Sequence, residues 1–90
     1  MDFEWDEAKR RSNIDKHGLD FRRALEIFDG RPRLDMPSPR GDEVRILSVA
    51  IFNDRFAAVT WIWRGDDKIR IISVRRARRA EERQYRQLHG

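Results

Sequence analysis

The sequence contains no cysteine and only two histidines, His17 and His89. The missing cysteines exclude disulfide bonds, thiolate metal ligands and cysteine nucleophiles. The histidine spacing fits no known metal-binding motif, and we expect neither a metal nor a cofactor. Neither a glycine-rich phosphate loop nor a G-x-S-x-G motif occurs, so conventional nucleotide-binding and serine hydrolase sites have no support.

Long apolar runs are also missing. The N-terminus, MDFEWDEAKRR, has no apolar signal-peptide core, and no segment approaches the length that spans a membrane. We therefore expect a soluble, cytoplasmic protein. The three prolines all fall within residues 30–42, where we predict an irregular or edge segment with a short strand around Arg33–Met36.

Charge, by contrast, is abundant. Charged residues make up 40% of the chain, with 20 Lys and Arg against 16 Asp and Glu, which gives a net charge of +4. A basic balance favours polyanionic partners such as RNA, DNA or an acidic protein. The 90 residues are expected to form one domain over residues 1–90, with a small core.

The N-terminal third predicts a short strand and two helices. Apolar and acidic residues alternate over residues 2–6, as they do in a half-buried strand. Asp6 is then expected to cap a helix that runs to about His17, and Asp20 to cap a second helix that ends at Asp29. The apolar stripe of the second helix comprises Phe21, Ala24, Leu25 and Phe28.

The C-terminal half predicts three strands, at residues 44–52, 55–64 and 68–74, and then a helix from Arg75 to about Leu88. The short turns between the strands indicate an antiparallel meander. The middle strand is apolar on both faces and should be central. The expected fold class is α+β: an antiparallel sheet of four to five strands, two N-terminal helices on one face and a C-terminal helix.

The predicted last helix has two distinct faces. The packing face comprises Ala77, Ala80, Glu81, Gln84, Tyr85 and Leu88. The cationic face comprises Arg75, Arg78, Arg79, Glu82, Arg83 and Arg86. Such a charge run usually marks a solvated surface, although arginine also suits bidentate phosphate contacts. A carboxylate on a packing face must pair with an arginine or line a polar cleft, and pairing is the expected role of Glu81.

Two further groups have an ordinary and a functional interpretation. Arg64, Arg70, Arg75 and Arg76 would create a positive cleft edge for a scissile phosphate if they lie together. Otherwise they pair with surface carboxylates. A histidine at a helix C-terminus, such as His17, most often packs or caps, but histidine also serves as a general acid or base.

Two separate segments resemble one known family. Residues 3–29, FEWDEAKRRSNIDKHGLDFRRALEIFD, resemble the pattern FEWD..K...N..KHG..F..A...F.D. Residues 64–86, within WRGDDKIRIISVRRARRAEERQYR, resemble RGD.IRIISAR.A...E...Y. Together these are typical of the BrnT family of type II toxins. The resemblance implies a RelE-like fold, metal-independent endoribonuclease activity and inhibition of translation.

The resemblance also implies partners. These are an RNA substrate and a cognate antitoxin of the BrnA type, a ribbon-helix-helix protein whose DNA-binding part lets the pair repress its own operon. The toxin would touch DNA only through the antitoxin, and a toxin dimer within the complex is expected. In ribonucleases of this kind the 2′-hydroxyl attacks the adjacent phosphate, and the protein supplies positioning, charge stabilisation and proton transfer.

The family motifs are carried over position by position. The matching residues are Asn13, Lys16, His17, Gly18, Phe21, Ala24, Phe28, Arg64, Gly65, Arg70, Ser73, Arg75, Ala77, Glu81 and Tyr85. The candidate catalytic residues are Lys16, His17, Arg64, Arg75, Arg76, Glu81 and Tyr85. The candidate RNA-binding residues are Arg70, Arg79, Arg83 and Arg86. The helical arginines would steer RNA or meet an acidic segment of the antitoxin.

Three positions depart from the family pattern. Val74 stands where the family usually has alanine, and Trp61 and Trp63 occupy strand positions where many members are expected to have polar residues. The two tryptophans share one strand face, so core packing is their expected role, and an exposed ring would be able to stack on a base. A second hypothesis is therefore a non-catalytic co-repressor subunit that binds nucleic acid and antitoxin without cutting RNA.

Overall fold

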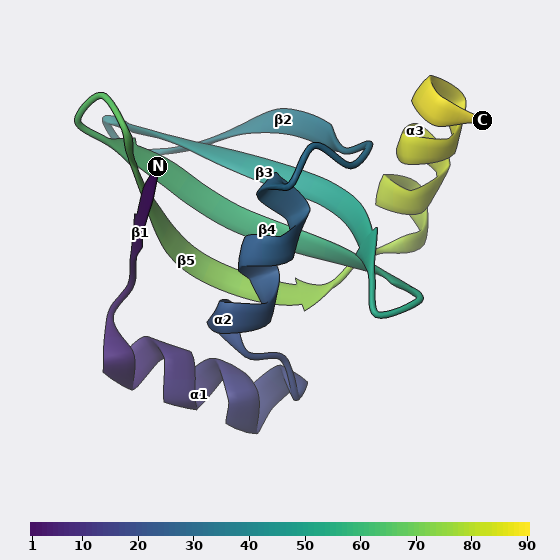
Figure 1. Ribbon diagram of the computed structural model, residues 1–90. Helices are drawn as coiled ribbons and strands as arrows, with labels where there is room; N and C mark the ends of the chain where they lie inside the picture. Colours follow the sequence, from purple (N-terminus) through teal and green to yellow (C-terminus); the bar gives the residue numbers. More distant parts are fainter.

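A five-stranded sheet forms the centre of the molecule in the computed structural model, which describes residues 1–90 (Figure 1). In chain order the elements are β1 (Asp2–Glu4), α1 (Glu7–His17), α2 (Phe21–Ala24), the 3₁₀ helix η1 (Leu25–Phe28), β2 (Leu34–Arg40), β3 (Glu43–Phe52), β4 (Arg55–Arg64), β5 (Lys68–Arg76) and α3 (Arg79–His89). None of these helices has both the length and the apolar composition needed to cross a lipid bilayer.

The strands lie in the order β1-β5-β4-β3-β2. Strands β2 to β5 form the predicted antiparallel meander with β4 at its centre, and the α+β class is confirmed. The pairing of β1 differs from the prediction, because β1 lies parallel to β5 and makes the sheet mixed. Most of the chain separates these two strands, so no tight turn imposes an antiparallel arrangement on them.

The predicted turns are present. Asn53 and Asp54 have φ of 55° and 63°, the left-handed values that a two-residue type I′ hairpin requires. Gly65 has φ of 74° at the start of the loop between β4 and β5. At the end of α1, Gly18 is left-handed and its N–H donates to Ile14, which stops the helix where predicted.

The second predicted helix changes its winding after one turn. Residues 25–28 form a 3₁₀ helix rather than a continuation of α2. Phe21 and Ala24 of α2 and Ile27 of η1 follow one another at a spacing of three residues, which puts them on one side of the helical segment, and all three are fully buried. The predicted stripe omitted Ile27, whereas Leu25 and Phe28 are only partly buried.

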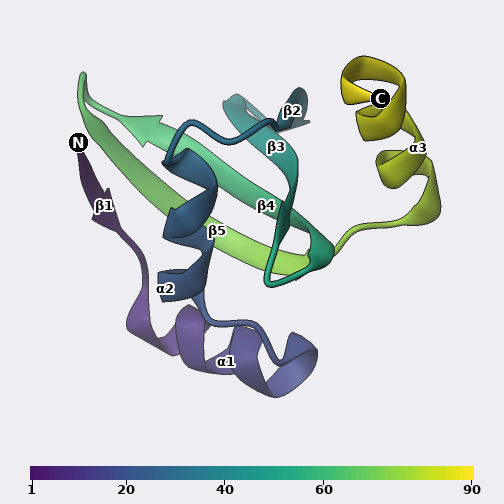
Figure 2. The same ribbon diagram turned by 45° about the vertical axis from the view of Figure 1, so that its right-hand side comes forward.

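The helices leave the two sheet faces unequally covered. In both views α2 and η1 lie across one face and α1 runs beside β5 (Figure 1, Figure 2). The main core lies under them and contains Leu19, Phe21, Ala24, Ile27, Ala50, Phe52, Ala57, Val59, Trp61, Ile69, Ile71 and Val74. α3 stands apart from the other helices, beyond the end of β5.

The predicted start of the last helix is wrong. β5 continues to Arg76, with Arg75 opposite Ala58 and Arg76 opposite Ala57, and α3 begins only at Arg79. The predicted packing face is correspondingly smaller. Its buried members are Glu81 and Tyr85, whereas Ala80, Gln84 and Leu88 are exposed and Ala77 precedes the helix.

The two strand tryptophans have different environments. Trp61 is buried, and its indole N–H donates to the Ser48 hydroxyl at 2.7 Å, which in turn donates to the Asp35 carboxylate. These bonds connect β4, β3 and β2 through side chains. Trp63 is 45% exposed and meets the Trp61 ring edge-on, with the centroids 5.4 Å apart. Core packing is therefore confirmed for Trp61 only.

Candidate functional site

The two motif segments meet at Asn13, which is buried on α1. Its Nδ2 donates to the carbonyl oxygens of Val74 at 2.7 Å and Leu19 at 2.8 Å, and its Oδ1 accepts from the Val74 N–H at 3.1 Å. β1 pairs with β5 only as far as Arg70, so Asn13 satisfies backbone groups that have no neighbouring strand. The C-terminal half of α1 is thereby held against β5.

A groove runs between α1 and β5 at this contact, with a volume of about 210 Å³. It is lined by Lys9, Ser12, Asn13, Lys16, His17, Ile72 and Ser73. The structure thus brings Lys16 and His17 of the first motif beside Ser73 of the second. His17 is exposed, and neither Lys9 nor Lys16 forms an ion pair. Two free ammonium groups and an imidazole suit charge neutralisation and proton transfer at a phosphate.

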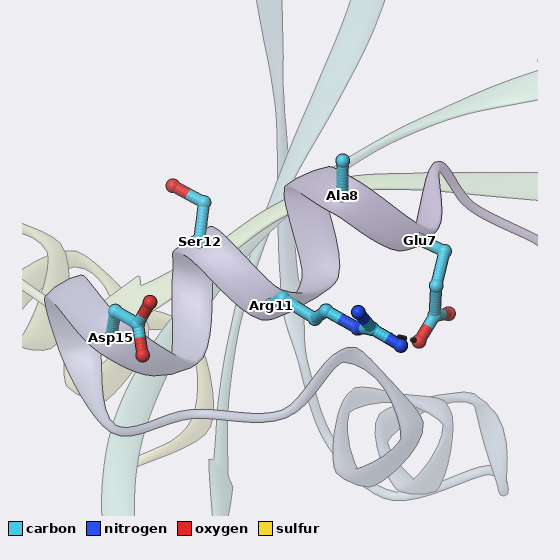
Figure 3. A pocket seen from close by; sticks show the side chains of 5 residues that line it. All are labelled: Glu7, Ala8, Arg11, Ser12 and Asp15. Carbon is cyan, nitrogen blue, oxygen red and sulfur yellow. Dashed lines mark ion pairs between the residues drawn. The ribbon is translucent and has the colours of Figure 1, made fainter.

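The outer face of the same helix has a different charge pattern. A depression there is lined by Glu7, Ala8, Arg11, Ser12 and Asp15 (Figure 3). Arg11 pairs with Glu7 at 3.8 Å, and Glu7 also pairs with Arg10. Because carboxylates offset the arginine charge on this side, it is poorly suited to an anion, and the groove facing β5 is the better candidate.

Arg75 and Glu81 are bound to each other. The two guanidinium nitrogens of Arg75 donate to the two carboxylate oxygens of Glu81 at 2.9 and 2.8 Å. Glu81 also accepts the backbone N–H of Arg78 at 2.8 Å and so caps the start of α3. The hydrogen bonds from Arg75 lower the pKa of Glu81 in spite of its burial, and the same contact raises the pKa of Arg75. The expected pairing of Glu81 is confirmed, and it fixes α3 to β5.

The lowered pKa of Glu81 predicts that the docking of α3 is acid-sensitive. A carboxylate whose pKa falls below its ordinary 4.5 on folding stabilises the fold above that pH, and the stabilisation is lost as pH falls through the folded-state value. We expect Glu81→Gln to lower the free energy of unfolding by about 1–2 kcal/mol at pH 7. Urea unfolding from pH 7 to pH 3 should show this difference shrinking; a difference independent of pH would contradict the assignment.

Tyr85 is buried on α3 and packs between two rings. Its ring meets Phe56 edge-on with the centroids 5.1 Å apart, and His89 lies 4.7 Å away. The guanidinium of Arg86 lies 5.0 Å from the Phe56 centroid on the same surface. These contacts give Tyr85 the role of positioning α3 and its arginines.

The α3 arginines form a second cationic region. A depression of about 390 Å³ at the end of β5 is lined by Asp54, Arg55, Phe56, Arg76, Ala77, Glu82 and Arg86. An adjoining depression on α3 is lined by Arg79, Glu82, Arg83 and Arg86. None of these arginines forms an ion pair within the protein. Arg76 and the helical arginines therefore lie together, joined by Arg55, which the sequence patterns did not indicate.

The predicted cluster of Arg64, Arg70, Arg75 and Arg76 is not formed. Arg64 lies opposite Lys68, whereas Arg76 lies opposite Ala57 at the other end of the hairpin. Seven residues along β4 separate the two positions by about 23 Å. Arg70 pairs with Glu4 at 2.6 Å, and its hydrogen bond lowers the pKa of Glu4. Arg64 and Arg76 thus lie at opposite ends of the β4–β5 hairpin, and Arg70 and Arg75 are each held in an ion pair.

His, Asp and Glu side chains nowhere gather in a group of three or more that would hold a metal ion. The side chains of Lys16, His17 and Arg76 form no ion pair within the protein.

Comparison with known proteins identifies the family. Residues 5–81 match the family model described as the ribonuclease toxin BrnT of type II toxin–antitoxin systems. The crystal structure of the Brucella abortus ribonuclease toxin BrnT is similar, with a TM-score of 0.68 and 33% sequence identity over 88% of this chain and 99% of that chain. No match is found among curated protein sequences. The predicted motifs and the predicted fold are thus both confirmed: the chain belongs to the BrnT family of ribonuclease toxins of type II toxin–antitoxin systems.

Proposed function

We propose that the protein is a metal-independent endoribonuclease that acts in the cytoplasm, cleaves RNA and so inhibits translation. Membership of the BrnT family supports the activity class. The observation that carries the proposal is the groove in which Lys16 and His17 of one motif face Ser73 of the other, with no carboxylate in the lining.

The proposed reaction is attack of a ribose 2′-hydroxyl on the adjacent phosphate. The new bond joins the 2′-oxygen to phosphorus, and the bond from phosphorus to the 5′-oxygen of the next nucleotide breaks. His17 takes the 2′-hydroxyl proton while a water molecule protonates the leaving 5′-oxygen, or a water molecule takes the 2′-hydroxyl proton while protonated His17 gives its own to the leaving oxygen. Lys9 and Lys16 neutralise the negative charge that grows on the phosphate oxygens. The products are a 2′,3′-cyclic phosphate and a 5′-hydroxyl.

The other candidate residues receive different proposed roles. Arg76 binds RNA phosphate beyond the groove. Arg75, Glu81 and Tyr85 are positioning residues, because their polar and aromatic contacts are made within the protein. Arg64 lies at the far end of β4 and has no part in this path.

The activity is tested with purified protein, a labelled RNA and EDTA. We expect cleavage to persist in EDTA and to leave cyclic phosphate ends, since no step uses a metal ion. Lys16→Ala should slow cleavage by about 100-fold, the effect of removing one group that stabilises the charge of the transition state. Arg64→Ala, which removes an equal charge elsewhere, should leave the rate unchanged. RNA binding without cleavage would instead support the co-repressor hypothesis, and rescue of an EDTA-treated enzyme by Mg²⁺ would contradict metal independence.

We further propose that a cognate antitoxin of the BrnA type neutralises the toxin, with a toxin dimer in the complex. The arginines of α3 would attract an acidic segment of that antitoxin. Addition of antitoxin should then stop cleavage, and Arg79→Glu should weaken the complex more than Arg40→Glu, an exposed substitution at the other end of the sheet.

A further inference from the structure

We propose that the depression between the β3–β4 hairpin and α3 is a second RNA subsite, in which Arg55, Arg76 and Arg86 bind a backbone phosphate beside the cleaved one. This inference rests on the proposed ribonuclease function and concerns the length of the RNA strand that the protein binds. The site adds a residue, Arg55, that belongs to neither family motif.

The three arginines come from β4, β5 and α3 and line one depression at the end of the sheet. Arg76 lies opposite Ala57, so Arg55 is its diagonal neighbour on one sheet face, at about 7–8 Å. The backbone N–H of Ala77 donates to the carbonyl of Phe56 at 3.2 Å, which holds the chain leaving β5 against the start of β4. Both guanidinium groups therefore project from fixed backbone.

Arg86 is positioned by an aromatic ring. Its guanidinium carbon lies 5.0 Å from the Phe56 centroid, and Tyr85 supports Phe56 edge-on. A stacked guanidinium keeps the N–H donors on its rim free and loses less side-chain freedom when it binds a phosphate. The arrangement therefore prepares Arg86 for an anion.

The charges in the depression remain unpaired. Asp54 and Glu82 also line it, yet no carboxylate oxygen lies within 4.0 Å of the three guanidinium groups, and Arg79 and Arg83 extend the positive surface along α3. At the opposite end of the sheet the unpaired carboxylates of Asp42, Asp66 and Asp67 offset the unpaired Arg40 and Arg64. The five unpaired arginines at α3 therefore favour an RNA strand that leaves the groove toward α3.

The separation of the two sites fits a single RNA strand. Ser73 lines the groove and Arg76 lines the depression, and three residues of extended strand separate them by about 10 Å. A dinucleotide in the groove is too short to reach α3 as well. The subsite should therefore strengthen binding of longer RNA and leave the shortest substrate unaffected.

The subsite is tested first by binding, with a hexadeoxynucleotide that lacks the attacking 2′-hydroxyl and carries no terminal phosphate. We expect Arg55→Ala to raise the Kd for this oligonucleotide by about tenfold, the usual loss for one charge-assisted contact, and to reduce the salt slope by about one. Phe56→Leu keeps an apolar side chain but removes the ring, and should weaken binding by about threefold.

The matched control is Arg64→Ala, which removes one exposed, unpaired arginine at the other end of β4 and should change the Kd by less than about twofold. In cleavage assays, Arg55→Ala should raise the KM for a hexaribonucleotide while kcat/KM for a dinucleotide stays constant. Equal losses in Arg55→Ala and Arg64→Ala would overturn the proposal, as would a loss of antitoxin affinity without a loss of oligonucleotide affinity. Because the hexadeoxynucleotide is never cut, this binding result stands even if the protein fails to cleave RNA.

Discussion

His17→Ala is expected to lower kcat for RNA cleavage by about 100- to 1,000-fold, the usual contribution of a general acid or base. In the proposed mechanism His17 is the one proton-transfer group in the groove between α1 and β5, and Lys9 and Lys16 supply only positive charge. Its side chain is exposed at the end of α1, so its removal should leave the fold intact. Single-turnover cleavage of a labelled RNA measures the effect.

The second histidine provides the matched control. His89 lies on α3, where its Nε2 is 3.0 Å from the carbonyl oxygen of Arg33. His89→Ala should therefore keep the wild-type rate. Equal rates for wild type and His17→Ala, with RNA binding retained, would remove His17 from the mechanism and move the proton transfer elsewhere.

Asn13→Ala is expected to lower the free energy of unfolding by about 3 kcal/mol. The substitution leaves the backbone N–H and C=O of Val74 and the carbonyl of Leu19 buried without partners. Each such group costs about 1–3 kcal/mol, and partial entry of water reduces the sum. Urea unfolding followed by circular dichroism measures the loss.

Two variants make the Asn13 result specific. Ser12→Ala changes an exposed neighbour on the same helix and should stay within about 0.5 kcal/mol of wild type. Asn13→Asp preserves the shape but places a carboxylate oxygen against two carbonyl oxygens, so it should be at least as destabilising as Asn13→Ala. Full stability of Asn13→Asp would show that the side chain fills space rather than bridging to β5.

Local signals in the sequence predicted much of the fold. Asp6 and Gly18 mark the two ends of α1 because one accepts the first free N–H groups and the other tolerates left-handed backbone. The Asn53-Asp54 turn follows from the same tolerance. These features depend on a few neighbouring residues, so they can be predicted without knowing which strands pair.

Features decided by distant partners were not predictable in the same way. Arg75 and Arg76 precede a helix-forming segment, yet pairing with Ala58 and Ala57 keeps them in β5. Cross-strand pairing overrides the local preference.

For the same reason, the sequence predicted some residues of the candidate site but not how they are arranged. Lys16 and His17 were indicated by their motif, but their place beside Ser73 depends on a long-range contact made by Asn13. The separation of Arg64 from Arg76 follows from hairpin register, which motif spacing does not reveal. No sequence pattern indicated Arg55, because its proposed role depends on the contact between the β3–β4 hairpin and α3.

The bond between Asn13 and Val74 joins residues 61 positions apart in the chain. A ribosome that has translated as far as β4 has made the lysines and the histidine of the groove but not the strand against which they are held. Since protein synthesis adds about 5–20 residues per second, this gap corresponds to several seconds in which the unfinished chain has no groove. By the proposed mechanism, an incomplete chain still attached to its ribosome would thus be unable to cut the message from which it is being made.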